Sequence, residues 1–266
     1  MPAIQLSKLK NQINQVVAQF NHPDIFLHEL RGLSEFYANR VHRVGLMGEP
    51  EPIQNHFNLP KPFLRQLQLA IIDLPAIYPD EAVTLARKLW NQPYYEFQLL
   101  SAYLLGFVPI TRATEVLHII QQFALSCQDK NILMELAEAS SNKIGHEHPD
   151  LLLKQIEEWM DCPEKNLNRL GLYALAKVSD EKDFENLPGV FTLIAPLTRK
   201  IDKRFKNEIL QVVISITKRS PTETAYLLKN NWTIFNQPDT AWLIRQCLEY
   251  FPAELRKSLQ EIIRPG

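Results

Sequence analysis

The chain has 266 residues, of which 45% are hydrophobic and 22% are charged, and its formal net charge is −1. This composition is that of a folded globular chain rather than a disordered one, and the length suffices for a core without disulfides or metals. Glycine is scarce, at 8 residues, while proline is plentiful, at 18, which argues against glycine-rich phosphate loops and hairpin-rich β folds and favours many short helices.

Cysteine usage and apolar runs indicate where the protein works. Cys127, Cys162 and Cys247 follow no motif spacing, so we expect reduced thiols. The first residues lack the apolar stretch of a secretion signal. The longest nearly apolar run, from Leu99 to Ile110, is too short to cross a bilayer. We therefore expect a cytoplasmic protein with no membrane partner.

Apolar residues at steps of three and four predict N-terminal helices within residues 1–45. The first predicted helix carries the apolar series Leu6, Leu9, Ile13, Val16, Val17 and Phe20. The second follows Pro23 and carries Ile25, Leu27, Leu30, Leu33 and Phe36. Two glycines and four prolines then fall within residues 40–62, so residues 46–62 are predicted to be a loop.

Residues 63–266 are predicted to form regular helix pairs. A capping acid or hydroxyl, or a first-turn proline, marks the helix starts at Lys61-Pro62, Pro79-Asp80, Gln92-Pro93, Asp129, Pro149-Asp150, Pro163-Glu164, Asp202, Ser220-Pro221 and Pro238-Asp239. Every second start recurs after roughly 31 to 39 residues, which is typical of stacked helix pairs. The sequence therefore predicts an all-α fold, a right-handed α-α superhelix (solenoid) of HEAT-like repeats, with residues 1–266 as a single domain.

Two β-branched segments compete with this interpretation. Val212 to Thr217 and Val190 to Ile194 could each form a strand. Helix signals flank both segments, so we predict helices at both places.

Motifs for cofactor and metal chemistry are absent from the sequence. The eight glycines form no GxGxxG or Walker loop, and no GxSxG, HExxH or CxxC is found. His146-Glu147-His148 has no evident partner cluster to complete a zinc site, so it is interpreted as a polar loop before Pro149. We expect neither a cofactor nor a metal.

The most basic segment runs from Arg199 to Lys206, and Lys218 and Arg219 follow at the end of the same predicted helix. The buried stripe of this helix is predicted to comprise Phe205, Ile209, Val212 and Ile216. A second face comprises Arg204, Gln211, Ser215 and Lys218. This face could track a phosphate backbone, or it could be an ordinary solvated face whose terminal cations interact with the helix dipole.

Several segments together resemble the AlkD-like DNA alkylation repair family, over roughly residues 50 to 235. They are Lys88 to Glu96 followed by Leu99 to Leu105, Ile53 to Pro62, Asn166 to Gly171, Asp202 to Arg219, and Pro221 to Leu228. The resemblance implies a curved HEAT-like solenoid, in agreement with the repeat spacing. The resemblance also implies a type of activity. Active members of the family excise positively charged alkylated bases from DNA, and they use an aspartate and two tryptophans to do so.

The chain departs from the family at these positions. Ile132 replaces the first tryptophan, and the aspartate position falls on Leu136, or on Glu135 with a slip of one residue. Val212 and Ser215 stand at the late tryptophan and arginine. Cationic lesions require a carboxylate and aromatic faces, so the resemblance with these departures implies lost or altered excision.

Three functions remain open at this point. The first is a DNA-binding protein, catalytically silent or altered, that contacts duplex or branched DNA through Arg169, Lys203, Arg204, Lys218 and Arg219. The second is an active glycosylase for alkylated bases that uses Glu135. The third is a scaffold that binds a protein partner, which the near-neutral net charge favours. In each case we expect a monomer.

Overall fold

The computed structural model describes residues 5–38 and 55–263. The described residues form α-helices and short 3₁₀ segments, and their one β contact is an isolated bridge between Asn55 and Tyr94. The prediction of an all-α helical-repeat fold is therefore confirmed. The chain divides into two compact units, Met1–Asn142 and Lys143–Gly266, which are described one at a time. The assignment of residues 1–266 to a single domain stays a prediction.

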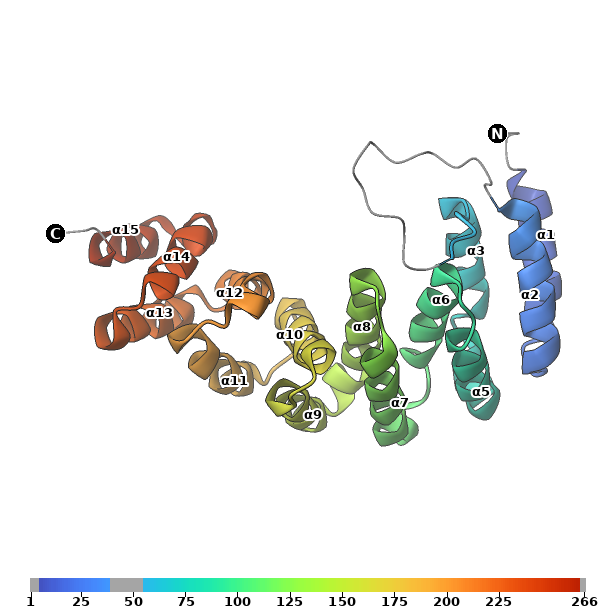
Figure 1. Cartoon of the computed structure of the whole chain (residues 1–266), viewed down its shortest axis with the longest axis horizontal. Coiled ribbons are helices and arrows are strands. Elements are labelled where there is room, and N and C mark those ends of the chain that lie inside the picture. Colours follow the sequence, from blue (N-terminus) through green and yellow to red (C-terminus); the bar gives the residue numbers. More distant parts are fainter. Residues whose placement is uncertain (1–4, 39–54, 264–266) are drawn as a thin grey trace. The chain divides into compact units, whose positions relative to one another are not determined.

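The first unit is built from consecutive antiparallel helices (Figure 1). They are α1 (Leu6–Val17), α2 (Pro23–Tyr37), α3 (Lys61–Ile71), the one-turn α4 (Leu74–Ile77), α5 (Pro79–Trp90), α6 (Tyr95–Leu105), the 3₁₀ segment η1 (Ile110–Arg112), α7 (Ala113–Ser126) and most of α8 (Lys130–Glu147). Helix α5 packs on both α2 and α6, and α1 packs on α3. Helices of the first pair therefore pack on helices of later pairs, α1 on α3 and α2 on α5, as stacked repeats require.

The second predicted helix buries only part of its apolar series. Ile25 and Phe36 are 47% and 68% exposed, whereas Phe26 and Leu30 are buried. The rings of Phe26 and Phe20 meet edge to face, with centroids 5.8 Å apart. The predicted helix is therefore confirmed as α2, and Ile25 and Phe36 fit the apolar period but lie outside its buried face.

The second unit forms two layers of helices (Figure 1). One layer contains α10 (Lys165–Asp180), α12 (Lys206–Arg219) and α14 (Pro238–Cys247). The other contains α9 (Pro149–Asp161), α11 (Leu187–Arg199), α13 (Pro221–Phe235) and α15 (Ala253–Ile262). Neighbours pack within each layer, and consecutive helices pack across the layers, which is the arrangement of helix-pair repeats.

Helix boundaries follow the capping signals of the sequence. The Asp129 carboxylate accepts hydrogen bonds from the amides of Asn131 (2.7 Å) and Ile132 (3.2 Å) at the start of α8. The Asp202 carboxylate accepts one from the Arg204 amide, at 2.9 Å, but a 3₁₀ turn, η2 (Lys203–Phe205), intervenes before α12. Both β-branched segments lie in helices, α11 and α12, as predicted.

The predicted loop at residues 46–62 lies partly outside the described residues. Within the described part, residues 55–60 are not helical, and α3 begins at Lys61, two residues before the predicted start of the regular pairs. The predicted N-terminal helices, at residues 1–45, end at Tyr37 where they are described.

Across residues 5–38 and 55–263, no single helix is long and apolar enough to cross a membrane. One pair, α6 with Ile110–Ser126, reaches that length and composition together, but it is bent by 107°.

Candidate functional site

A buried carboxylate fastens residues 55–60 to the start of α6. Glu96 is 4% exposed and accepts hydrogen bonds from the backbone amides of Phe57 (3.1 Å) and Leu59 (3.4 Å). The Tyr95 amide also donates to the Asn55 carbonyl, at 3.0 Å. Asn58 adopts a positive φ of 54°, a conformation that asparagine tolerates better than most residues. The segment is therefore held at both ends against α6.

This anchoring places an aromatic group beside Tyr95. The rings of His56 and Tyr95 lie 4.6 Å apart at an angle of 33°. On the other side of the segment, the Phe57 ring stacks on Tyr94 at 4.1 Å. Of these four rings, Phe57 is buried, whereas Tyr94, His56 and Tyr95 are partly exposed, and the His56 and Tyr95 rings lie together.

Tyr95 also faces the first turns of α8. Burial raises the pKa of its phenol, and the nearby carboxylates of Asp129 and Glu135 raise it further, while a hydrogen bond with the Asn131 side chain lowers it. These effects together favour the protonated phenol. We call Tyr95, His56, Asp129, Asn131 and Glu135 the acidic aromatic cluster.

The register of α8 decides which side chains belong to this cluster. Ile132 and Leu136 are fully buried, so neither of these side chains is presented to a ligand. Asn131 is exposed and Glu135 is partly exposed, one turn apart on the same face. Of the two positions left open for the carboxylate, Glu135 is thus the accessible one, and it lies beside an aromatic ring.

The basic residues predicted from the sequence have different surroundings. Lys203 and Arg204 are both exposed. The Arg204 guanidinium makes a two-pronged ion pair with Asp202, with its shortest contact, from Nη2, at 2.6 Å. Arg204 belongs to η2 rather than to α12, so it does not continue a face of that helix.

The predicted polar face of α12 is interrupted in its middle. Ser215 is fully buried, and its hydroxyl has no hydrogen-bond partner among the described residues. The prediction of a continuous face through Ser215 was therefore wrong, because the packing of α12 between α10 and α14 covers this position. The predicted buried stripe was correct: Phe205, Ile209, Val212 and Ile216 are all buried.

The two cations at the end of α12 differ. Lys218 is exposed, and its ammonium lies 5.6 Å from the centroid of the Tyr250 ring. Arg219 instead donates to three backbone carbonyls, those of Glu181, Lys182 and Phe184. Its guanidinium is therefore occupied by the connection between α10 and α11.

Arg169 lies on α10 and its side chain contacts α12. Its Nε is 3.2 Å from the Glu208 carboxylate, and its side chain is 32% exposed. Of the five predicted DNA contacts, Lys203 and Lys218 are thus exposed without an ion pair among the described residues, and the three arginines have partners within the protein.

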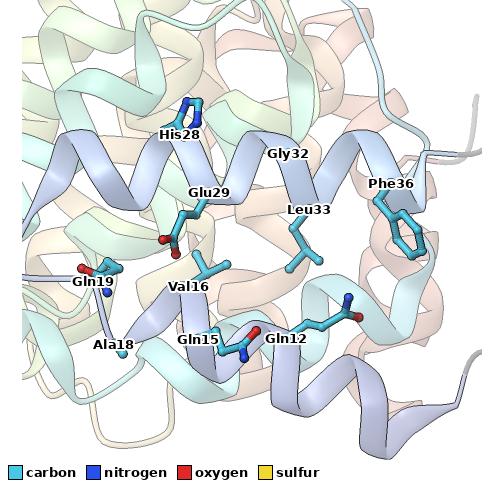
Figure 2. Close-up of a pocket in the computed structure, with 10 residues that line it drawn as sticks. All are labelled: Gln12, Gln15, Val16, Ala18, Gln19, His28, Glu29, Gly32, Leu33 and Phe36. Carbon is cyan, nitrogen blue, oxygen red and sulfur yellow. The ribbon is translucent and has the colours of Figure 1, made fainter.

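An open groove lies between α1 and α2 (Figure 2). Figure 2 shows Val16 of α1 and Leu33 of α2 between the two helices, with Glu29 beside them. The other lining residues are Gln12, Gln15, Ala18, Gln19, His28, Gly32 and Phe36. This lining carries a carboxylate and neutral amides and is unsuited to phosphate, so we assign no nucleic-acid contact to it.

Sequence reasoning missed most of the acidic aromatic cluster. Tyr95 lies in a segment that resembles the family and Asp129 marks a helix start, but neither was assigned a role, and His56 was not singled out. The available signal was the short Tyr94-Tyr95-Glu96 run at the start of a helix, but the amides that Glu96 binds belong to Phe57 and Leu59 and not to that helix. In the described parts of the chain, no group of three potential metal ligands is found, including around His146 and His148.

Comparisons with known proteins give the fold and the family. A family model described as "DNA alkylation repair enzyme" matches residues 57–251. Among solved structures, AlkD2 from Streptococcus mutans and smu.31 from Streptococcus mutans UA159 each superpose with a TM-score of 0.55 at 15% identity. Each match covers 71% of this chain and 100% or 98% of the other, respectively. No curated protein matches the sequence.

Proposed function

Because this chain belongs to the DNA alkylation repair enzyme family, we propose that it binds DNA and holds a cationic alkylated base against the acidic aromatic cluster. The two similar solved structures, at 15% identity, support the fold of the chain, but they do not support the binding of DNA or of a damaged base.

The observation that carries the proposal is the surroundings of Tyr95. Its ring is partly exposed, and the carboxylates of Asp129 and Glu135 act on its phenol. An electron-rich ring attracts a cation through its face, and neighbouring carboxylates add attraction that is stronger where water is partly excluded. A flat purine that carries a positive charge after alkylation fits both features, whereas an ordinary neutral base fits only the ring.

Exposed lysines of the second unit supply contacts to the DNA backbone in this proposal. Lys203 and Lys218 are exposed at opposite ends of the segment that contains α12. Phosphate contacts of this kind carry no sequence information and weaken steeply with salt. The Arg204 guanidinium is already paired with the Asp202 carboxylate, so we expect Arg204 to contribute less to DNA binding.

Excision is the part of the family chemistry that we expect to be weak. Val212 and Ile132 are fully buried, and Asn131 presents an amide rather than a ring on the accessible face of α8. The cluster therefore offers carboxylates and one tyrosine but few aromatic surfaces to enclose a flipped base. We propose recognition of the lesion with little or altered base release.

Equilibrium binding to two matched duplexes tests the proposal. One duplex carries a single cationic methylated purine, and the other is undamaged. We expect the parent to prefer the damaged duplex by roughly threefold to tenfold, the scale of one partly screened cation contact. Glu135→Gln should reduce this preference, while Glu138→Gln, at an exposed position three residues further along α8, should leave it unchanged. Equal binding of both duplexes by the parent would refute lesion recognition.

Salt dependence tests the backbone contacts separately. Removing a lysine that contacts one phosphate should lower the slope of log affinity against log salt by about 0.9. We expect Lys203→Gln and Lys218→Gln each to lower the slope, and Lys154→Gln, an exposed control on α9, to leave it unchanged. A double variant at Lys203 and Lys218 that binds as tightly as the parent at low salt would show that DNA binds elsewhere or not at all.

A further inference from the structure

An ion pair between α10 and α12 joins Arg169 to a buried carboxylate. The Arg169 Nε lies 3.2 Å from Glu208 Oε1, and Glu208 is 8% exposed. A buried carboxylate costs free energy unless a cation or hydrogen-bond donors accompany it. The guanidinium is therefore part of what allows Glu208 to lie in the interior of this unit.

Tyr173 provides a second contact to the same carboxylate. It lies one turn after Arg169 on α10, and its hydroxyl donates to Glu208 Oε1 at 3.3 Å. Burial raises the pKa of Tyr173 to about 12, and the charge of Glu208 acts in the same direction. The phenol consequently stays protonated and remains a donor at physiological pH.

The contact constrains one side of the Arg169 guanidinium. Nε is buried, and its N–H is not aligned for a hydrogen bond despite the short distance, so the contact is an ion pair. The side chain as a whole is 32% exposed. A guanidinium is a planar fork, and when Nε faces inward its terminal nitrogens are the groups that can reach an anion.

We propose that Glu208 and Tyr173 are positioning residues. They hold the Arg169 guanidinium with its two terminal nitrogens facing outward, as a fork that binds one phosphate group of DNA. This inference rests on the proposed function, because it assigns a place and a geometry to one of the backbone contacts. An arginine that is already ordered loses less side-chain entropy when it binds, so its contact is stronger than that of a free arginine.

Glu208 has two opposing effects on a phosphate at this place. Its negative charge repels the phosphate, and its contact with Nε orders the arginine. If repulsion dominates, Glu208→Gln should tighten DNA binding, because it removes that charge from a site of nearly the same shape. If positioning dominates, the same substitution should weaken binding. The sign of the change therefore distinguishes the two.

The experiment measures affinity of the full chain for an undamaged duplex at low salt, for single and double variants. We expect Glu208→Gln and Tyr173→Phe to weaken binding by roughly threefold to tenfold, and Arg169→Ala by at least as much. In the Arg169→Ala background, Glu208→Gln should cause no further weakening. Lys154→Gln, which removes one exposed cation from α9, is the control and should change affinity less than twofold.

Tighter binding by Glu208→Gln, or an equal weakening with and without Arg169, would overturn the proposal. Tyr173→Phe removes only a hydroxyl, so it keeps the test open if Glu208→Gln does not fold. A parent that binds no DNA would refute the proposed function. The positioning of the Arg169 guanidinium is then tested with inorganic phosphate as the anion. A phosphate-dependent shift of the Arg169 Nε–H resonance that disappears in Glu208→Gln would support the fork. An unshifted resonance in the parent would refute it.

Discussion

Arg219 donates a hydrogen bond of 3.0 Å to the carbonyl of Phe184, and so joins the last residue of α12 to the segment between α10 and α11. The same guanidinium donates to the carbonyls of Glu181 and Lys182. The Phe184 side chain is itself buried, at 2% exposure. One arginine therefore satisfies three carbonyl acceptors in a connection that has little regular structure. This basic residue at the end of α12 thus stabilises the fold.

We expect Arg219→Ala to lower the free energy of unfolding by about 2 kcal/mol, because it leaves three carbonyls without their charged donor. Chemical denaturation monitored by circular dichroism measures this change. Lys218→Ala, one residue earlier and exposed, is the control and should change the same quantity by less than about 0.5 kcal/mol. Equal stability of the two variants would show that the three hydrogen bonds are not formed in solution.

Loss of the Glu96 carboxylate should release the segment that carries His56. Glu96→Ala removes the acceptor of the Phe57 and Leu59 amides, at a cost of about 2 kcal/mol, whereas Glu96→Gln keeps one acceptor oxygen and should cost less. Amide hydrogen exchange at Phe57 and Leu59 should become faster in both variants. As a matched control, Glu35→Gln alters an exposed carboxylate and should leave these two amides protected. Unchanged protection in Glu96→Ala would contradict the anchoring role.

The helices could be predicted from the sequence because their signals are local. A proline or an acid at the start of α5, α9, α13 and α14 restricts the backbone or binds the first-turn amides without help from other helices. The 3.6-residue period likewise identified the buried stripe of α12. The period was less informative for α2, where apolar residues occur on more than one face and packing against α1 and α5 decides which is buried.

The candidate site could not be predicted in the same way, because its contacts join residues far apart in the chain. His56 and Tyr95 meet across 39 positions through the backbone bonds to Glu96, and Arg169 meets Glu208 across a similar separation. A sequence shows that a residue is basic but not whether an interior carboxylate already pairs with it. For this reason the basic residues near α12 looked equivalent in the sequence, although Arg219 and Lys218 have different surroundings.

Tyr173 should make the stability of the protein sensitive to alkaline pH. Burial, followed by the charge of Glu208, raises its pKa in the folded state to about 12, above the value near 10 of an unfolded chain. Folding therefore favours the protonated phenol. The resulting stabilisation is complete below about pH 10 and is lost as the pH rises from about 10 towards 12.

We expect the unfolding free energy of Tyr173→Phe to fall less steeply over this interval than that of the parent. Denaturation midpoints measured at several pH values between about 9 and 12 give both curves. Tyr226→Phe, at a position that is 72% exposed, is the matched control and should follow the parent. Parallel curves for the parent and Tyr173→Phe would show that the phenol is not held by burial and Glu208.

The last prediction is that this chain releases no alkylated base at a rate typical of its family. Positioned groups that stabilise charge in an active site are each worth on the order of 3 kcal/mol, so the loss of several removes most of a rate. Ile132, Leu136 and Val212 are fully buried, and none of them carries a group that could stabilise a cationic base. Glu135 is the remaining candidate, because it is partly exposed and its carboxylate acts on the phenol of Tyr95.

The assay measures release of methylated purine from alkylated DNA by the parent, by Glu135→Gln and by the control Glu138→Gln. We expect slow or undetectable release from all three. Robust release by the parent and by Glu138→Gln, with none from Glu135→Gln, would contradict this prediction and make Glu135 the carboxylate of an active glycosylase.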